Sequence, residues 1–223
     1  MAGIVSSPAR TPLTRAAVLR AAIAIADAEG LDALSMRALG AALGVQAMSL
    51  YNHVANKDAV LSAIVDEVVG EIELPRPGEP WKAEMRRRAT SAHAVLLRHP
   101  WACGLMMSRT NTGPAMLRYI DATLGCLHAG GFSLPMADQV WNAMDSFVYG
   151  FTLQALRFPV RPEDFAATAS AHLHLVPADR YPAMHALSVM VARGEHRGLQ
   201  ELEFGLALLL DGLERLRGEG GDG

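Results

Sequence analysis

The sequence predicts an all-α protein with two domains. Alanine and leucine dominate, runs of β-branched residues are scarce, and no Asn-Gly or Asp-Gly hairpin turn separates alternating strands. Apolar residues recur instead at helical spacing in segment after segment. Hydrophobic residues make up 51% of the 223, which is ample for a core. A break at PRPGEP, residues 75–80, marks the expected domain boundary.

Charge and motif content narrow the class of function. The net charge is −3, so the chain as a whole is not a polycation. Its N-terminal part is nearly balanced, which argues against non-specific coating of nucleic acid and favours a few placed contacts doubled by a dimer. The sequence contains no GxSxG, P-loop, GxGxxG after a strand or HExxH. It therefore predicts a protein that is not an enzyme.

Cysteine and hydropathy patterns predict a cytoplasmic protein that makes no membrane contact. Cys103 and Cys126 lie in apolar surroundings, as reduced core cysteines do, although sequence alone leaves a disulfide open. No CxxC pair or zinc spacing occurs, so no metal and no cofactor are expected. The start MAGIVSSPAR does not resemble a signal peptide, and no apolar run approaches the roughly 20 residues of a membrane span.

Prolines and glycines that interrupt helices divide the chain into four parts. Residues 1–12 are expected to be a flexible arm, and residues 13–74 a first domain that includes a connecting helix. Residues 75–217 are expected to be a larger second domain, and residues 218–223 a disordered tail. Thr14 is expected to cap the first helix, which ends at Gly30 and supports the segment that follows.

The stretch from Leu34 to Asp58 predicts a helix-turn-helix. Ser35 is a suitable N-cap for the first of its helices, and Gly44 stands where a helix ends in a left-handed residue. Asn56 is expected to cap the helix that follows the motif. A short second helix from Gln46 to His53 would turn Leu50 inward. Such a second helix fits the major groove. The alternative, two amphipathic helices in an ordinary bundle, also fits this pattern.

The outward residues have the chemistry of DNA contacts. Glutamine at 46 can pair with adenine through two hydrogen bonds, and Ala47 and Met48 can touch a thymine methyl. Other side chains can bind phosphate or base edges. The complete predicted DNA-binding set is Arg37, Gln46, Ala47, Met48, Ser49, Tyr51, Asn52, His53 and Lys57.

Further helices are expected along the rest of the chain. The helix that starts at Trp81 carries a basic cluster, which is either a phosphate patch or, more commonly, a solvated face. The cluster consists of Lys82, Arg86, Arg87 and Arg88. The segment from Arg161 to Pro177 could be a short helix or a mobile loop. The expected helices run from Asn56 to Ile72, Trp81 to His99, Trp101 to Arg109, Pro114 to Gly130, Pro135 to Phe158, Tyr181 to Arg193 and Gly198 to Arg217.

Methionines and aromatic residues gather in the second domain on four of these helices. Methionine adapts to irregular apolar shapes, so such a lining suits a ligand cavity between helices. A packed core explains the same residues equally well.

The order of residues in LSMRALGAALGVQAMSLYNHVANKDAVLSAI resembles the DNA-binding head of the tetracycline-repressor family. The resemblance covers about fifty residues. GEPW at 78–81, LLRH at 96–99 and GFSL at 131–134 resemble more loosely the C-terminal domain of the tetracycline-repressor type. The family implies double-stranded operator DNA, a small-molecule effector and a homodimer as partners. It also implies that residues 13–74 are the helix-turn-helix DNA-binding domain and residues 75–217 the effector-binding and dimerisation domain. In the family, helices matching 135–158 and 198–217 form a four-helix bundle between subunits.

The same resemblance implies positions for the effector pocket. Arg88 falls where the tetracycline repressor has a drug-binding asparagine, Ala92 at a neighbouring aromatic position, Met106 at the metal-binding histidine and Arg109 near a threonine. A thioether is a poor magnesium ligand, so a metal-free, largely apolar effector is expected. The complete predicted pocket is Arg88, Ala92, Trp101, Met106, Arg109, Met144, Phe147 and Phe151.

The combined prediction is a ligand-responsive transcriptional repressor that binds a palindromic operator as a homodimer. Two alternative functions remain open. One is a helical enzyme that carries the helix-turn-helix only as a structural unit, and the other is an activator or a ligand-independent regulator.

Overall fold

Side-chain caps that the sequence predicts begin three of the N-terminal helices in the computed structural model, which describes residues 12–196 and 201–219. Helix α1 (Arg15–Glu29) follows Thr14, whose hydroxyl accepts a 3.1 Å hydrogen bond from Ala17 N–H. Helix α2 (Met36–Leu43) follows Ser35, and α4 (Lys57–Val69) follows Asn56. The three predicted N-caps are confirmed, because each cap depends only on residues three positions apart.

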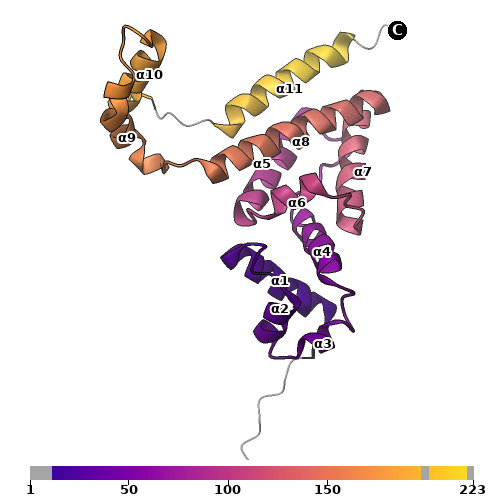
Figure 1. Ribbon diagram of the computed structural model, residues 1–223. Helices are drawn as coiled ribbons and strands as arrows, with labels where there is room; N and C mark the ends of the chain where they lie inside the picture. The colour runs from indigo at the N-terminus through magenta and orange to yellow at the C-terminus, as the bar shows by residue number, and fades with distance from the viewer. Residues whose placement is uncertain (1–11, 197–200, 220–223) are drawn as a thin grey trace, which may run out of the picture. The chain divides into compact units, whose positions relative to one another are not determined.

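The described residues contain helices and no strand, so the all-α prediction is confirmed (Figure 1). The segment left open between 161 and 177 contains a helix flanked by two short 3₁₀ turns. None of the described helices is long and apolar enough to cross a membrane. The other helices are α3 (Ala47–Leu50), α5 (Trp81–Arg98), α6 (Ala102–Ser108), α7 (Pro114–Ala129), α8 (Leu134–Arg157), α9 (Phe165–His172), α10 (Pro182–Ala192) and α11 (Leu202–Glu219).

Three predicted features touch residues that the structure does not describe. These are the arm up to residue 11, the start of the last helix at Gly198 and the tail from residue 220. Helix α11 itself continues to Glu219, two residues beyond its predicted end.

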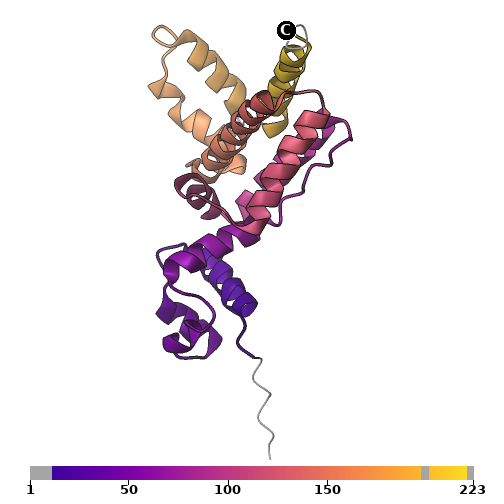
Figure 2. The same ribbon diagram turned by 90° about the vertical axis from the view of Figure 1, so that its right-hand side faces the viewer.

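The first compact unit, up to Gly130, contains α1 to α7. Helices α1, α2 and α3 form a small head, and α4 packs against α1 as well as against α6 and α7 (Figures 1 and 2). Helix α4 is therefore buried on more than one face. Its buried side chains are Val60, Ala63, Ile64, Val65, Val68 and Val69.

The second compact unit starts at Gly131 and contains two helix pairs. The long helix α8 packs against α11, and α9 packs against α10 (Figure 2). Close packing of the first pair is visible at Gly205, where an added Cβ would lie 2.6 Å from Phe147 Cζ. Apolar side chains remain exposed on α11, among them Phe204 and Leu208.

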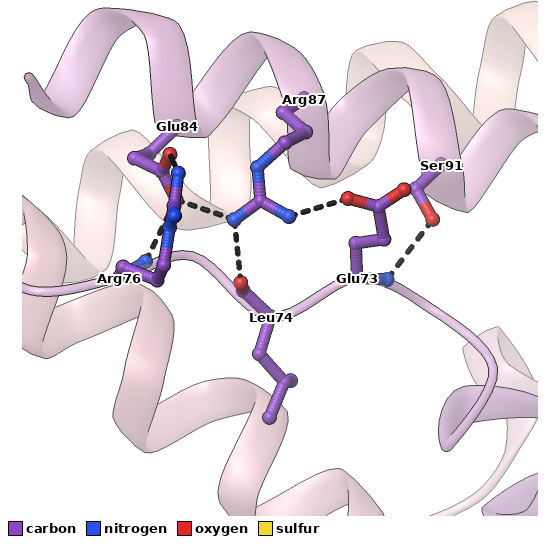
Figure 3. Close-up of polar contacts among 6 residues, drawn as sticks. All are labelled: Glu73, Leu74, Arg76, Glu84, Arg87 and Ser91. Carbon is purple, nitrogen blue, oxygen red and sulfur yellow. Dashed lines mark hydrogen bonds and ion pairs between the residues drawn. The ribbon is translucent and has the colours of Figure 1, made fainter. Parts of the chain in front are cut away.

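The boundary between the two compact units falls after Gly130, whereas the sequence predicts a domain boundary at residue 75. Ion pairs that tie the segment after α4 to α5 account for the difference (Figure 3). Arg87 binds both Glu73 and Glu84, and Arg76 Nη2 lies 2.9 Å from Glu84 Oε1. The proline-rich segment is therefore held against α5 as part of the first unit. The functional division at 74/75 stays a prediction.

The buried carboxyl of Glu84 is the centre of this network. Hydrogen bonds from Arg76 and Arg87 hold its pKa at about 2, below the ordinary 4.5. The hydrogen bonds that Arg87 donates to Glu84 and Glu73 raise its own pKa. The expected solvated face is therefore wrong for Arg87, which binds carboxylates, and for Arg88, which is buried.

Candidate nucleic-acid interface and effector site

A tight glycine turn joins α2 to α3. Gly44 ends α2 with φ of 65°, a left-handed conformation that glycine adopts without strain. Gly40 lets the two helices approach closely, because an added Cβ would lie 2.8 Å from the Val45 carbonyl oxygen. The predicted helix-turn-helix is therefore present, with its turn where the sequence places it.

The second helix of this motif is one turn long and is followed by a hydrogen-bonded turn. Helix α3 spans Ala47–Leu50, shorter than the predicted Gln46 to His53. The amide groups of His53 and Val54 both donate to the Leu50 carbonyl, which gives the chain after α3 a turn in place of further helix. Leu50 is fully buried as predicted and anchors the motif to the head.

Most of the predicted DNA-binding side chains are exposed around this anchor. Met48 is 74% exposed and Tyr51 is 47% exposed, values that are high for large apolar or aromatic side chains. Ala47 and His53 are half-buried. The exposed members of the predicted set are Arg37, Gln46, Met48, Ser49, Tyr51, Asn52 and Lys57.

Lys57 is the first residue of α4, directly after the Asn56 cap. Its neighbour Asp58 is bound by Arg109, with Nη2 and Oδ1 2.6 Å apart. The Arg109 hydrogen bond and charge lower the pKa of Asp58. Arg109 was predicted to line the effector pocket, but the structure places its guanidinium against the start of α4.

Four of the predicted pocket residues are buried in the first unit. Arg88 is fully buried on α5, and its Nη1 donates a hydrogen bond to the Tyr119 hydroxyl on α7. The guanidinium carbon lies 5.2 Å from the centroid of the Tyr119 ring. Tyr119 was missed by the sequence reasoning, which weighed α7 only as an apolar stripe. The four residues are Arg88, Ala92, Trp101 and Met106.

Trp101 and Asp27 form a contact that the sequence did not suggest. The indole Nε1 donates to Asp27 Oδ1 over 2.6 Å, and His99 Nδ1 lies 2.8 Å from the same oxygen. The partners are 72 and 74 residues apart, so no local spacing signals the contact. Trp101 is thus bound to a helix of the head.

The remaining predicted pocket residues belong to the second unit. Met144 is buried, and Phe147 and Phe151 are half-buried with ring centroids 5.9 Å apart. On the same helix, Trp141 and Tyr149 both donate to Asp145 Oδ2, over 2.8 and 3.0 Å. Sequence reasoning missed this cluster, although its four-residue spacing could have revealed it.

Two cavities in the first unit have linings that mix charged and apolar side chains. One of about 510 Å³ lies beside α5, and its lining includes Glu73, Arg87 and Arg98. Another of about 480 Å³ lies beside α4, and its lining includes Asp66 and Asn111. Neither is lined by a predicted effector residue. Among the described residues, no group of three or more histidine, cysteine, aspartate and glutamate side chains is placed to hold a metal.

Comparisons with known proteins agree with this arrangement. Residues 18–64 match the family described as bacterial regulatory proteins of the tetR family, and residues 74–217 match the tetracyclin repressor-like C-terminal domain. The HTH-type transcriptional repressor DrrR1 of Streptomyces coeruleorubidus is 34% identical over 224 residues, covering 94% of this chain and 81% of the relative.

Solved structures show the same fold. Apo ActR from Streptomyces coelicolor is 31% identical and covers 96% of this chain and 100% of its own, with a TM-score of 0.79. ActR in complex with actinorhodin is 29% identical and covers 95% and 100%, with a TM-score of 0.80. The helix-turn-helix, the C-terminal helices and these relatives together identify the chain as a member of the TetR family of transcriptional regulators.

Proposed function

We propose that this protein is a ligand-responsive repressor that binds a palindromic operator as a homodimer. The observation that carries the proposal is the exposed surface around α3, where Gln46, Met48 and Ser49 face solvent while Leu50 is buried. A buried anchor beneath exposed hydrogen-bonding side chains is what a helix needs to read the major groove. Residues 13–74 would bind DNA, and residues 75–217 would bind the effector and form the dimer.

Repression is supported by the names of the relatives. DrrR1 is a transcriptional repressor, and tetracycline repressor proteins are 26–31% identical to this chain. A repressor blocks transcription only while it occupies its operator. An effector that binds the DNA-free conformation more tightly would therefore relieve repression.

Dimerisation is supported by the apolar surface of α11. Phe204 and Leu208 lie one helical turn apart and are 69% and 61% exposed in the single chain. Neighbouring exposed apolar side chains of this size favour burial against another surface. In the homodimer, α8 and α11 of each subunit would meet their counterparts, and two heads would face two half-sites about one helical turn apart.

A small effector is supported by the structures of ActR with actinorhodin and with (S)-DNPA. In this chain, Arg88 would recognise such a ligand through its charge and its hydrogen-bond donors. The proposed effector is metal-free and largely apolar, and it carries a carboxylate or carbonyl group toward Arg88. Met106, at the position of a metal-binding histidine in the tetracycline repressor, suits an apolar surface better than a magnesium ion.

The decisive experiment is selection of bound DNA from a random duplex pool with the purified protein. Recovery of an inverted repeat, bound with an affinity that falls as salt rises, would support both DNA recognition and the dimer. Recovery of no preferred sequence would contradict the proposal. Catalytic turnover of a candidate ligand would instead favour the alternative that the protein is a helical enzyme.

The effector class has its own test. Magnesium–tetracycline titrated into the protein is expected to show no tight binding and no release of the selected duplex. Magnesium-dependent binding at micromolar concentration would contradict the metal-free effector and the pocket positions inferred from the family.

A further inference from the structure

A cluster of polar side chains joins the head to the corner between α5 and α6. Asp27, near the C-terminus of α1, receives the Trp101 indole N–H at 2.6 Å. The same oxygen, Oδ1, lies 2.8 Å from His99 Nδ1. His99 is the C-cap of α5 and Trp101 is the N-cap of α6, so two hydrogen bonds attach α1 to the short connection between these helices.

The chemistry of this corner fixes its hydrogen-bond directions. A carboxylate oxygen only accepts, and an indole nitrogen only donates. The proton between Asp27 and His99 therefore resides on Nδ1, which donates to the carboxylate. On the other side of the ring, Glu71 Oε1 lies 3.3 Å from His99 Nε2. Both His99 and Trp101 are buried, which strengthens these bonds relative to the same bonds in water.

The corner is a second attachment between the head and the helices that follow it. The first attachment is α4, which is covalent and carries contacts of its own to α6 and α7. The second attachment is on α1, which lies beside α4, so it holds the head at a point away from the α4 axis. A body held at α4 alone can swing or twist about that helix, whereas a second attachment on α1 resists both motions.

We infer that Asp27 is a positioning residue that fixes the orientation of the DNA-binding head through His99 and Trp101. The inference rests on the proposed function, because head orientation matters only for a protein that binds two half-sites at once. Trp101 is the N-cap of α6, and this helix carries the candidate effector residue Met106. Movement of α6 would therefore reach α1 directly, in parallel with the path through α4.

Asp27→Ala tests the inference, with Asp32→Ala as the matched control. Asp32 is an exposed aspartate in the turn after α1, so its replacement removes the same charge from the head. Each variant is measured on the palindrome selected by the wild-type protein and on a duplex that carries one half-site. For Asp27→Ala, affinity for the palindrome should fall about tenfold while half-site affinity stays at the control value, because loosened heads lose the benefit of simultaneous binding.

Two outcomes would contradict the inference. An unchanged ratio of palindrome to half-site affinity would show that the corner does not orient the head. A parallel fall on both duplexes would show that Asp27 supports the fold of the head and not its orientation.

A measurement without DNA separates the inference from the proposed function. Spin labels on cysteines introduced at Ala41 of α2 and Thr90 of α5, both exposed, report the head's position within one subunit. Labelled protein is diluted with unlabelled protein to suppress distances between subunits. The wild type should give a narrow distance distribution and Asp27→Ala a broad one. Equal widths would overturn the inference even if the wild type bound no DNA.

Discussion

Several charged side chains of this protein hold its helices and loops together. Glu84 is buried between Arg76 and Arg87, and its oxygens accept hydrogen bonds from both. Arg88, one position further along α5, is buried toward α7 and contacts Tyr119. Adjacent arginines of one helix thus point to different partners, because successive helical positions face directions about 100° apart.

Glu84 predicts a defined dependence of stability on pH. Its pKa is about 2 in the folded protein and near the ordinary 4.5 in the unfolded chain, so its stabilisation is fully present above about pH 4.5 and is lost as the pH falls through 2. Glu84→Gln should lower Tm at neutral pH, with a gap to the wild type that closes toward pH 2. Thermal unfolding measured across this range checks the prediction, with exposed Glu79→Gln as the control. A gap that stays constant with pH would contradict it.

The proposed DNA-contacting residues predict two distinguishable kinds of defect. Lys57→Ala should weaken binding to all duplexes alike and reduce the slope of log affinity against log salt by about one per subunit, because it removes the proposed phosphate contact. Gln46→Ala should relax preference at one base position per half-site, with a discrimination loss of about 1–3 kcal/mol. Arg193→Ala, which removes an exposed charge outside the head, is the control. A change of sequence preference in Lys57→Ala at undiminished affinity would reverse these roles.

Residue-scale features were predictable where their partners are local. The caps Thr14, Ser35 and Asn56 were visible in the sequence because each binds an amide three positions later. The contacts of Asp27 and Tyr119 were not, since their partners lie on other helices. Hydrophobic periodicity indicates which face of a helix is buried, but it does not indicate which polar group of a neighbouring helix that face contacts.

At the scale of elements, one helix supplies the cap of another. Helix α7 has Gly113 at its N-cap and Pro114 after it, and Gly113 has no side chain that could bind the first amides. Asp66 of α4 takes this role, because its carboxylate accepts from Met116 N–H at 2.9 Å and from Ala115 N–H at 3.2 Å. A carboxylate at this end of a helix also interacts favourably with the helix dipole.

Removal of this cap should be measurable. Asp66→Ala is expected to destabilise the protein by about 1 kcal/mol, the usual cost of losing a capping side chain. The neighbouring Glu67→Ala, at an exposed position of the same helix, should change the free energy of unfolding little. Denaturant unfolding of both variants tests the difference. Equal free energies of unfolding for the two variants would mean that water stabilises the first amides of α7 as well as Asp66 does.

At the scale of the whole molecule, the exposed side chains of α11 predict the assembly. Leu208→Glu places a charge where the single chain leaves leucine 61% exposed, so each subunit should stay folded while the dimer dissociates. Light scattering should report a monomer, and affinity for the palindrome should fall to that for a half-site. Leu97→Glu, the same change at an exposed position of α5, is the control.

The contrasting variant is Leu210→Glu. Leu210 is fully buried within the chain, so its replacement should unfold the subunit and not merely separate two of them. A Leu208→Glu protein that remains dimeric with unchanged melting would remove this part of α11 from the subunit interface.

The architecture as a whole was more predictable than its divisions. Helix order and most helix ends followed from caps, prolines and apolar spacing. The extent of the compact units did not, because proline and glycine at 75–80 suggested a linker while Glu73, Arg76 and Glu84 bind it to α5. The composition of a segment indicates how flexible that segment is by itself, whereas the boundary of a compact unit depends on contacts between segments that are distant in the sequence.

The burial of α4 limits how new regulators can be made from this one. A chimera that exchanges residues up to 74 for the equivalent part of a relative would keep α6 and α7 but replace the helix that packs on them. Helices α6 and α7 would then meet a foreign helix in place of Val65, Val68 and Val69, and the amides at the start of α7 would lose Asp66. Under the proposed function, sequence preference is therefore best transferred by grafting the few exposed residues around α3, with α4 left in its native surroundings.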